Sequence, residues 1–253
     1  VNGISCALEQ GILKVEFVTP DVVRVQYTGE NTFIGNGTDV CLPRAVDNPV
    51  RWVYTPNPDC YLLKSDSLIV RVDLSTASIT YLDKEGGLLL QEDQNIPRIS
   101  EKRVTKQVIY DEHSKHIEKT ADGDKEIKNV LRYDTIGHTW KYRINFKWQP
   151  LEALYGWGSH MEDYMNLRGK ELYLCQHNLK AMVPVLNSTA GYGLLFDAGC
   201  AMMFKDNSEG SFVELEAAKQ IDYYFMKGKT MDAVVANYRM LTGNSPMMPL
   251  YLF

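Results

Sequence analysis

Large apolar and polar side chains alternate strictly between residues 140 and 148, and this period of two constrains the fold more than any other feature. The large side chains are Trp140, Tyr142, Ile144, Phe146 and Trp148, separated by Lys141, Arg143, Asn145 and Lys147. Such alternation is typical of a β-strand with one buried face. A slip of one residue would expose every aromatic ring, so the register is strongly specified. We expect the row to fill a core between two sheets, with a sugar-stacking platform as the alternative.

Shorter runs with the same period recur along the chain. Residues 11–28 predict a hairpin, and residues 68–90 predict a meander with tight turns. Residues 31–59 are rich in Gly, Asn and Pro and predict surface loops with one short strand near Trp52 to Tyr54. Further strands are expected at 104–110, 130–133, 201–204, 212–215 and 220–226. These alternating, β-branched runs favour antiparallel sheets over crossover helices.

One helix is expected near the end of the chain. Thr230 is suited to be its N-cap, Asp232 favours its first turn, and Gly243 lies where it would stop. Its apolar face would carry Val234, Val235, Tyr238 and Leu241. The predicted fold class is therefore mainly β, an antiparallel β-supersandwich with a short C-terminal helix.

Length and charge restrict the function. A chain of 253 residues is expected to form one large domain, and no apolar run approaches the roughly 20 residues of a membrane span. The net charge of −5, with scattered basic residues, argues against a nucleic-acid partner and favours a neutral ligand such as sugar. The five cysteines include no C-x-x-C pair, and neither a metal nor a cofactor is predicted. We expect a soluble protein, either cytoplasmic or periplasmic or secreted with its signal removed.

The stretch richest in turns lies between Tyr155 and Asp197. Five glycines interrupt its short apolar runs, which is a pattern of strands separated by tight turns. Directly after a strand-like run that ends at Cys175 comes a polar group formed by Gln176, His177, Asn178 and Lys180. Loops at strand ends are places where a scaffold holds donors and acceptors toward a polyhydroxylated ligand. Residues 175–180 are therefore the candidate site.

Motifs in a fixed order then identify a family. They are Tyr155-Gly156-x-Gly158, Asn166-Leu167-Arg168-Gly169, Gly191-Tyr192-Gly193-x-x-Phe196-Asp197, Asp222-Tyr223-Tyr224-Phe225, Thr242-Gly243 and Pro246-x-x-Pro249. Together they resemble the N-terminal β-sandwich of glycoside hydrolase family 31, and their order is far more specific than any single motif. The resemblance covers most of the chain. It implies a galactose mutarotase-like domain over 1–245, with 246–253 as a linker and the start of a (β/α)8 barrel. The apolar run at 250–253 resembles the beginning of a strand, which favours a chain cut inside the first element of that following domain.

The resemblance also implies a function. Members are retaining α-glycosidases, among them α-xylosidases and α-glucosidases, which act on O-glycosyl bonds of α-linked oligosaccharides. Their two catalytic aspartates belong to the barrel, and no residue here matches either motif. We therefore assign no catalytic residue and expect the fragment alone to be inactive. The expected partners are the chain's own C-terminal barrel and the sugar, and a homo-oligomer is left open.

In that family the sandwich lends one loop to the sugar subsite. By motif order this loop corresponds to residues 175–180, and the implied substrate-binding residues are Asn178 and His177. Asn178 stands where the family usually has an aspartate. An aspartate only accepts hydrogen bonds, whereas an asparagine donates and accepts, so the substrate is left open between glucosides, xylosides and other α-linked sugars. The alternative is that Asn178 merely forms a turn.

Two rival functions would use a similar sandwich. A stand-alone aldose epimerase needs a histidine acid and a glutamate base that face one groove, and its candidates are His138, His160 and His177. A carbohydrate-binding module would use the aromatic row. The run 111–118 also carries histidines and carboxylates, but without a second ligand cluster it is expected to be a solvated loop.

Overall fold

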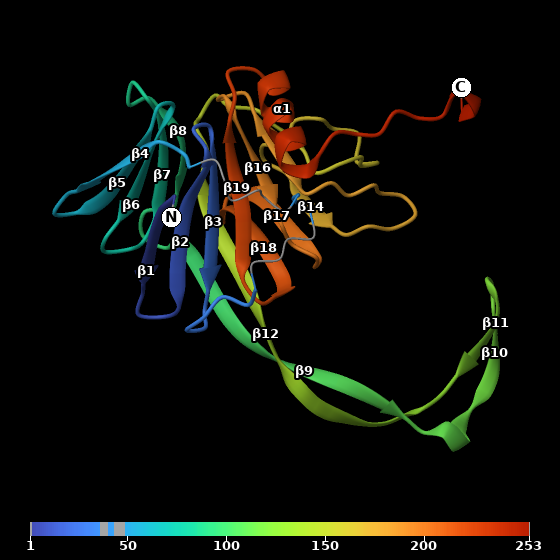
Figure 1. Cartoon of the computed structure of the whole chain (residues 1–253). Helices are drawn as coiled ribbons and strands as arrows, with labels where there is room; N and C mark the ends of the chain where they lie inside the picture. The colour runs from blue at the N-terminus through green and yellow to red at the C-terminus, as the bar shows by residue number, and fades with distance from the viewer. Residues whose placement is uncertain (1, 36–39, 43–48, 253) are drawn as a thin grey trace.

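The computed structural model describes residues 2–35, 40–42 and 49–252. Most of them form two large antiparallel sheets that pack face to face, as Figure 1 shows, and a separate two-stranded sheet lies outside this sandwich; this confirms the predicted fold class. The smaller sheet has the strand order β1-β2-β3-β19-β16-β15-β13. Its strands are β1 (Gly3–Ala7), β2 (Ile12–Thr19), β3 (Val22–Thr28), β13 (Leu154–Gly156), β15 (Val185–Ser188), β16 (Tyr192–Phe196) and β19 (Ile221–Lys227).

The larger sheet has the order β14-β17-β18-β12-β8-β7-β6-β5-β4, and β9 also pairs with β12. Its strands are β4 (Trp52–Pro56), β5 (Cys60–Ser65), β6 (Leu68–Asp73), β7 (Ile79–Asp83), β8 (Leu88–Glu92), β9 (Arg98–Tyr110), β12 (Val130–Lys147), β14 (Glu171–Leu174), β17 (Met202–Asn207) and β18 (Gly210–Ala218). The remaining elements are η1 (Glu112–Ser114), β10 (His116–Thr120), β11 (Gly123–Ile127), α1 (Met231–Thr242) and η2 (Leu250–Leu252).

The aromatic row on β12 is confirmed as core. All five large side chains lie on the face that meets the other sheet, and none is more than 8% exposed. Across the interface, the ring of Tyr81 from β7 stacks on Phe225 from β19 with centroids 4.0 Å apart. Because rings from both sheets fill this layer, the row is not available as a sugar-stacking platform.

A buried ion pair lies within the same core. The carboxylate of Glu92 on β8 accepts hydrogen bonds from Arg98 Nη2 at 2.5 Å, from the N–H of Ile79 at 2.8 Å and from the Tyr223 hydroxyl at 3.0 Å. The Glu92 side chain is 0% exposed and that of Arg98 is 5% exposed. Burial of two charges is tolerated only with such close pairing. The pair ties the start of β9 to both sheets.

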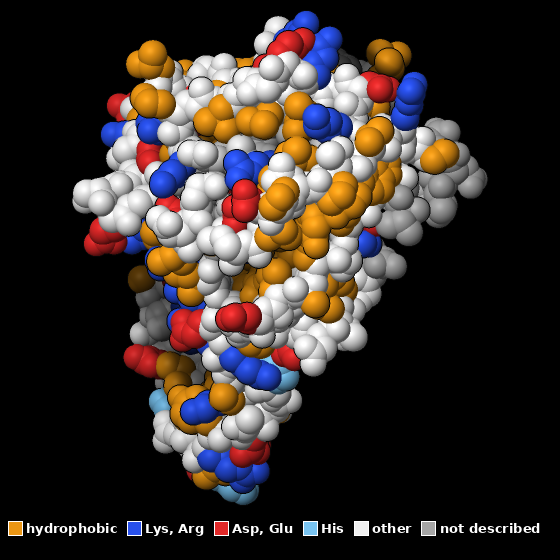
Figure 2. Space-filling view, turned by 90° about the vertical axis from the view of Figure 1, so that its left-hand side faces the viewer, with side chains coloured by type: hydrophobic (Ala, Val, Ile, Leu, Met, Phe, Trp, Pro, Cys, Tyr) orange, Lys and Arg blue, Asp and Glu red, His pale blue; other side chains and the backbone are white. Residues whose placement is uncertain are grey.

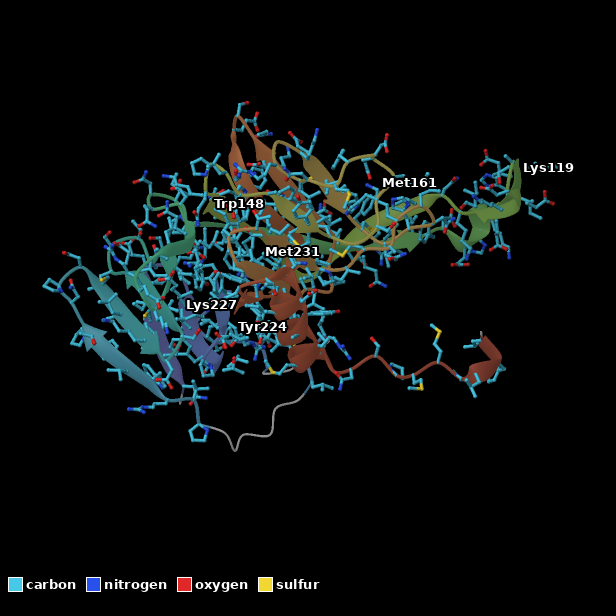
Figure 3. All side chains as sticks on the ribbon, turned by 90° about the horizontal axis from the view of Figure 1, so that it is seen from above. Lys119, Trp148, Met161, Tyr224, Lys227 and Met231 are labelled. Atoms are coloured by element: carbon cyan, nitrogen blue, oxygen red, sulfur yellow. The ribbon has the colours of Figure 1, made fainter. Side chains whose placement is uncertain are left out.

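The predicted helix is present as α1 and covers the outer face of the smaller sheet. The Thr230 hydroxyl accepts the N–H of Ala233, and Gly243 follows the last turn with a φ of 93°. Val234 and Leu241 pack on Tyr224 of β19 in a second apolar cluster. Figure 3 labels Tyr224 beside the helix and Met231 at its start. Within the described ranges, no helix is long and apolar enough to cross a membrane.

A two-stranded arm leaves the sandwich. β9 and β12 pair from Arg98 opposite Ile144 out to Tyr110 opposite Val130, while β18 pairs with β12 only near the base. The outer part of the two strands, η1 and the β10–β11 hairpin form the arm, defined as residues 102–138. It projects from the body in Figure 1, and Figure 3 labels Lys119 at its far end.

The arm corrects two predictions. Separate strands were expected at 130–133 and 140–148, but β12 is one strand from Val130 to Lys147. Bulges between Val130 and Arg132 and between Thr135 and Gly137 each insert a residue, which breaks the alternation in the sequence while the pairing continues. The solvated loop expected at 111–118 contains η1 and β10 instead, because backbone pairing with β11 orders this exposed, charged segment.

The edge strand β4 and the C-terminal residues test the remaining predictions about secondary structure. The strand near Trp52 is confirmed as β4, whereas 36–39 and 43–48 of the predicted loop region lie outside the described residues. Residues 250–252 form the 3₁₀ turn η2 rather than the start of a strand, and Phe253 is outside the described residues. Figure 2 views the side of β4 and β5 and shows hydrophobic side chains gathered across it; the edge strand β4 exposes Val53 and Tyr54.

Candidate functional site

The candidate loop is a tight turn beyond the end of β14. Asn178 and Leu179 occupy its centre, and His177 and Lys180 pair across it, with the Lys180 N–H donating to the His177 carbonyl at 3.1 Å. The N–H of Leu179 donates to Nδ1 of His177 at 3.3 Å. Nδ1 is therefore an acceptor, which places the ring proton on Nε2 and leaves that atom as a donor.

The two flanking polar residues are used by the turn itself. Gln176 closes its base, since its Nε2 donates to the Lys180 carbonyl at 2.8 Å and its Oε1 accepts the N–H of Met182 at 3.0 Å. The Lys180 ammonium forms an ion pair with Glu162, and its hydrogen bond lowers the pKa of that carboxyl. Gln176 and Lys180 thus hold the turn in place.

A second segment anchors the turn from below. Ser159 forms a β-bridge with Ala181, and a Cβ on Gly158 would lie 1.9 Å from the Ala181 carbonyl oxygen. Gly158 also has a φ of 92°, which side chains rarely adopt. Between the two glycines of the Gly-x-Gly motif, Trp157 is fully buried against Phe196, with ring centroids 5.6 Å apart. The motif therefore lets two backbones meet while one large ring anchors them in the core.

The turn leaves two polar side chains for a ligand. His177 and Asn178 are both exposed, and the Asn178 side chain forms no hydrogen bond with any residue that the structure describes. Together they offer a neutral amide, which donates and accepts, and the imidazole Nε2 donor. This arrangement suits recognition of a neutral hydroxylated molecule. That Asn178 and His177 bind substrate stays a prediction.

The sequence predicted one group of four polar residues in this loop, but it did not show that two of them hold the turn and two are left open to a ligand. Glu162 is distant from Lys180 in the chain, so its pairing with that lysine has no local signal. The available signal was Gly158, because an isolated glycine beside a strand indicates close backbone approach, although its partner segment is not readable from the sequence.

The three histidines proposed for an epimerase lie in unlike surroundings. His138 is on the arm, and its Nε2 hydrogen-bonds directly to Glu30 Oε1 at 2.9 Å on an exposed surface. Both ring nitrogens of His160 are buried and have no partner among the described residues. Among the described residues no histidine lines the surface cleft between Gln91 and Ser211, and no group of three or more His, Cys, Asp or Glu side chains could hold a metal ion.

Fold and turn together define the class: a large antiparallel β-sandwich that presents a short polar turn beyond one of its strands. A family model described as the glycosyl hydrolase 31 N-terminal galactose mutarotase-like domain matches residues 12–204. The chain belongs to this family.

Individual relatives agree with the assignment. The chain is 23% identical over 250 residues to a protein of Saccharolobus solfataricus named alpha-xylosidase, covering 95% of the chain and 29% of the relative. It is 29% identical over 119 residues to an uncharacterized family 31 glucosidase of Pseudescherichia vulneris, covering 46% of the chain and 22% of the relative. The chain thus spans less than a third of the length of these curated relatives.

Solved structures share the fold over nearly the whole chain. A family 31 dextranase of Flavobacterium johnsoniae, in complex with isomaltotriose, matches with a TM-score of 0.72 and 20% identity over 98% of this chain and 28% of its own. A family 31 alpha-xylosidase from a soil metagenome, in complex with xylose, matches with a TM-score of 0.73 and 18% identity over 98% of this chain and 34% of its own.

Proposed function

We propose that the chain is the non-catalytic N-terminal domain of a retaining family 31 α-glycosidase that acts on α-xylosides or α-glucosides. The sandwich, residues 1–245, packs on a C-terminal catalytic barrel, with 246–253 as the linker and the start of that barrel. The turn at 175–180 contributes Asn178 and His177 to the site for an α-linked oligosaccharide. Family membership supports this role, as do relatives that are named alpha-xylosidase or were solved with xylose and isomaltotriose.

The observation that carries the proposal is the state of the polar groups in the turn. Gln176 and Lys180 are engaged internally, while the Asn178 amide and His177 Nε2 are exposed. Large apolar side chains are also exposed: Leu179 in the turn is 63% exposed, and Met161, in the segment that contacts the turn through Ser159 and Glu162, is 70% exposed. Polar groups held ready beside exposed apolar ones are typical of a surface that another domain and a ligand cover together.

Replacing Asn178 in the enzyme that includes the barrel tests the site. Asn178→Ala should raise KM for an aryl α-xyloside or α-glucoside by roughly 2- to 12-fold, because one hydrogen bond contributes about 0.5–1.5 kcal/mol. The matched control is Asn129→Ala, which removes another side-chain amide that has no partner among the described residues. Equal kinetic constants for the two variants would contradict the assignment of Asn178.

Activity of the 253-residue chain separates the domain from its rivals. Incubated with chromogenic α-glucosides and α-xylosides, the chain alone should release no chromophore, and release would show that it carries its own catalytic groups. Polarimetry of freshly dissolved glucose tests the epimerase. Mutarotation faster than in buffer would favour that rival over the proposed role.

A further inference from the structure

A cleft of about 690 Å³ lies on the solvent face of the larger sheet, away from the core. Its floor is the outward row of β12, where Arg143, Asn145 and Lys147 alternate with buried side chains. One wall is the connection from β8 to β9, and the other is Arg168 with the turn between β17 and β18. We call it the β12 cleft. Its volume lies within the range of small-molecule sites, about 300–1,000 Å³.

The wall from β8 to β9 is held rigidly. Asp93 Oδ1 accepts the N–H groups of Asn95 and Ile96, both at 2.9 Å, which fixes the turn. From the floor, Asn145 Nδ2 donates to the Ile96 carbonyl at 2.7 Å. The Arg143 guanidinium stacks 4.0 Å above the Phe212 ring and is held there. A ligand would therefore meet groups that need little ordering, and this favours binding.

Each cation that lines the cleft is paired with a carboxylate. Arg143 pairs with Glu214 at 3.0 Å, Arg168 with Asp206 at 2.9 Å, and Lys147 with Asp93 at 3.6 Å. A phosphate or carboxylate ligand would have to compete with a carboxylate already beside each cation. Glu209, which also lines the cleft, forms no ion pair with any described residue, so the cleft offers no excess of positive charge to attract an anion, and a neutral ligand fits it better.

Uncharged polar groups remain for that ligand. The side-chain amides of Gln91 and Asn95 form no hydrogen bond with any described residue, and the same holds for Asn145 Oδ1. An amide donates and accepts at once, as a sugar hydroxyl does. Beside them, Ile96 is 56% and Ile99 43% exposed, which gives an apolar surface for the C–H groups of a sugar ring.

We propose that the β12 cleft binds a short neutral oligosaccharide through the amides of Gln91, Asn95 and Asn145, with Ile96 and Ile99 against its rings. This site is independent of the turn at 175–180 and does not rest on the proposed function. It would hold a glycan chain on the outer face of the larger sheet, so that the domain recognises carbohydrate at a place where it needs no catalytic group.

Titration of the ¹⁵N-labelled 253-residue chain with isomaltotriose tests the site. Backbone signals of residues 91–99, 143–147 and 209–211 should shift and saturate, with a dissociation constant on the order of 1 mM, as expected for an open polar cleft. Triglycine with an acetylated N-terminus and an amidated C-terminus serves as an uncharged peptide probe. Absence of saturable shifts at up to about 50 mM sugar, or triglycine binding as tightly as the sugar, would overturn the proposal.

Variants locate the binding. Asn95→Ala combined with Gln91→Ala should weaken isomaltotriose binding by roughly 5- to 150-fold, since two hydrogen bonds of about 0.5–1.5 kcal/mol each are lost. Should the double variant fail to fold, Asn95→Ala alone tests the same site, because Asn95 lies in a turn and its replacement leaves strand β8 unchanged. Asn129→Ala and Asn178→Ala should leave the shifts in the cleft unchanged. The assignment of the binding site to the β12 cleft would be refuted if binding disappeared with Asn178→Ala, or if it stayed unchanged in the double variant of Gln91 and Asn95.

Discussion

Replacing Glu92 with glutamine should test whether the buried ion pair stabilises the sandwich. The new side chain keeps the shape of the old one. Its carbonyl can accept from Arg98 and Ile79, and its NH₂ group can then donate to the Tyr223 hydroxyl. The change removes the negative charge and reverses the direction of one hydrogen bond. Arg98, 5% exposed, then remains as a buried cation without a counter-charge.

The magnitude can be worked out from that burial. Removing one partner of a buried pair costs about 3–5 kcal/mol, because the other charge stays desolvated. A domain of ordinary stability has about 5–15 kcal/mol in total, so Glu92→Gln should lower the urea midpoint of unfolding strongly. The control is Glu101→Gln, whose partner Arg103 lies 3.0 Å away with both side chains largely exposed; it should change the free energy of unfolding by less than about 1 kcal/mol.

Circular dichroism during urea unfolding gives the midpoint and the slope of the free energy of unfolding against urea concentration. A loss below about 1 kcal/mol at unchanged slope for Glu92→Gln would refute the reasoning. Replacing both partners, Glu92→Leu with Arg98→Met, provides a second check. Because no charge is left buried, the double variant should be more stable than Glu92→Gln. If it is not, the lone cation is not the source of the loss.

Three further changes probe other parts of the chain. Asp206→Asn should be less stable than the wild type at pH 7 but should lose less stability in acid. Burial tends to raise the pKa of Asp206, yet hydrogen bonds, led by the one from Ser211, lower this pKa overall. The wild type therefore loses the stabilisation from the charged carboxylate as the pH falls below about 4. Melting temperatures between pH 3 and 7 measure it, and parallel curves would contradict it. Gly158→Ala should cost about 1–3 kcal/mol and speed hydrogen exchange in the turn, because its Cβ meets a backbone carbonyl at positive φ, whereas Gly137→Ala, with open space around it, should be nearly neutral. Replacing residues 104–138 with Asn-Gly should change the free energy of unfolding by less than about 1 kcal/mol, since two strands that stand apart from the core add little to it; a larger drop in the urea midpoint would disprove that independence.

Local pattern predicted the sandwich well where one face of a strand is buried. The alternation around Tyr142 and Ile144 located β12 and its core face, and the caps at Thr230 and Gly243 bounded α1. It failed where both faces are exposed. In the arm no buried face selects apolar residues at every second position, so the sequence carries no period and the pairing is visible only in three dimensions.

The position of the turn at 175–180 was predictable from the sequence, but the contacts that hold the turn in place were not. The polar run after Cys175 indicated an exposed turn, and the structure has such a turn directly after β14. Which of its groups remain open to a ligand depends on Glu162 and on the bridge between Ser159 and Ala181, contacts that no local pattern encodes. The β12 cleft is even less predictable from local pattern, because its walls come from residues 91–99, from Arg168 and from residues 209–211, which are far apart in the chain.

The continuity of β12 from the core to the outer arm has a mechanical consequence. About ten residues of each strand lie beyond the base, a reach of roughly 33 Å at about 3.3 Å per residue. A rotation of only about 10° at the base would carry the end of this lever through roughly 6 Å. A partner that binds the outer end of β12 would also restrain Asn145, because the outer end and the floor of the β12 cleft belong to the same strand.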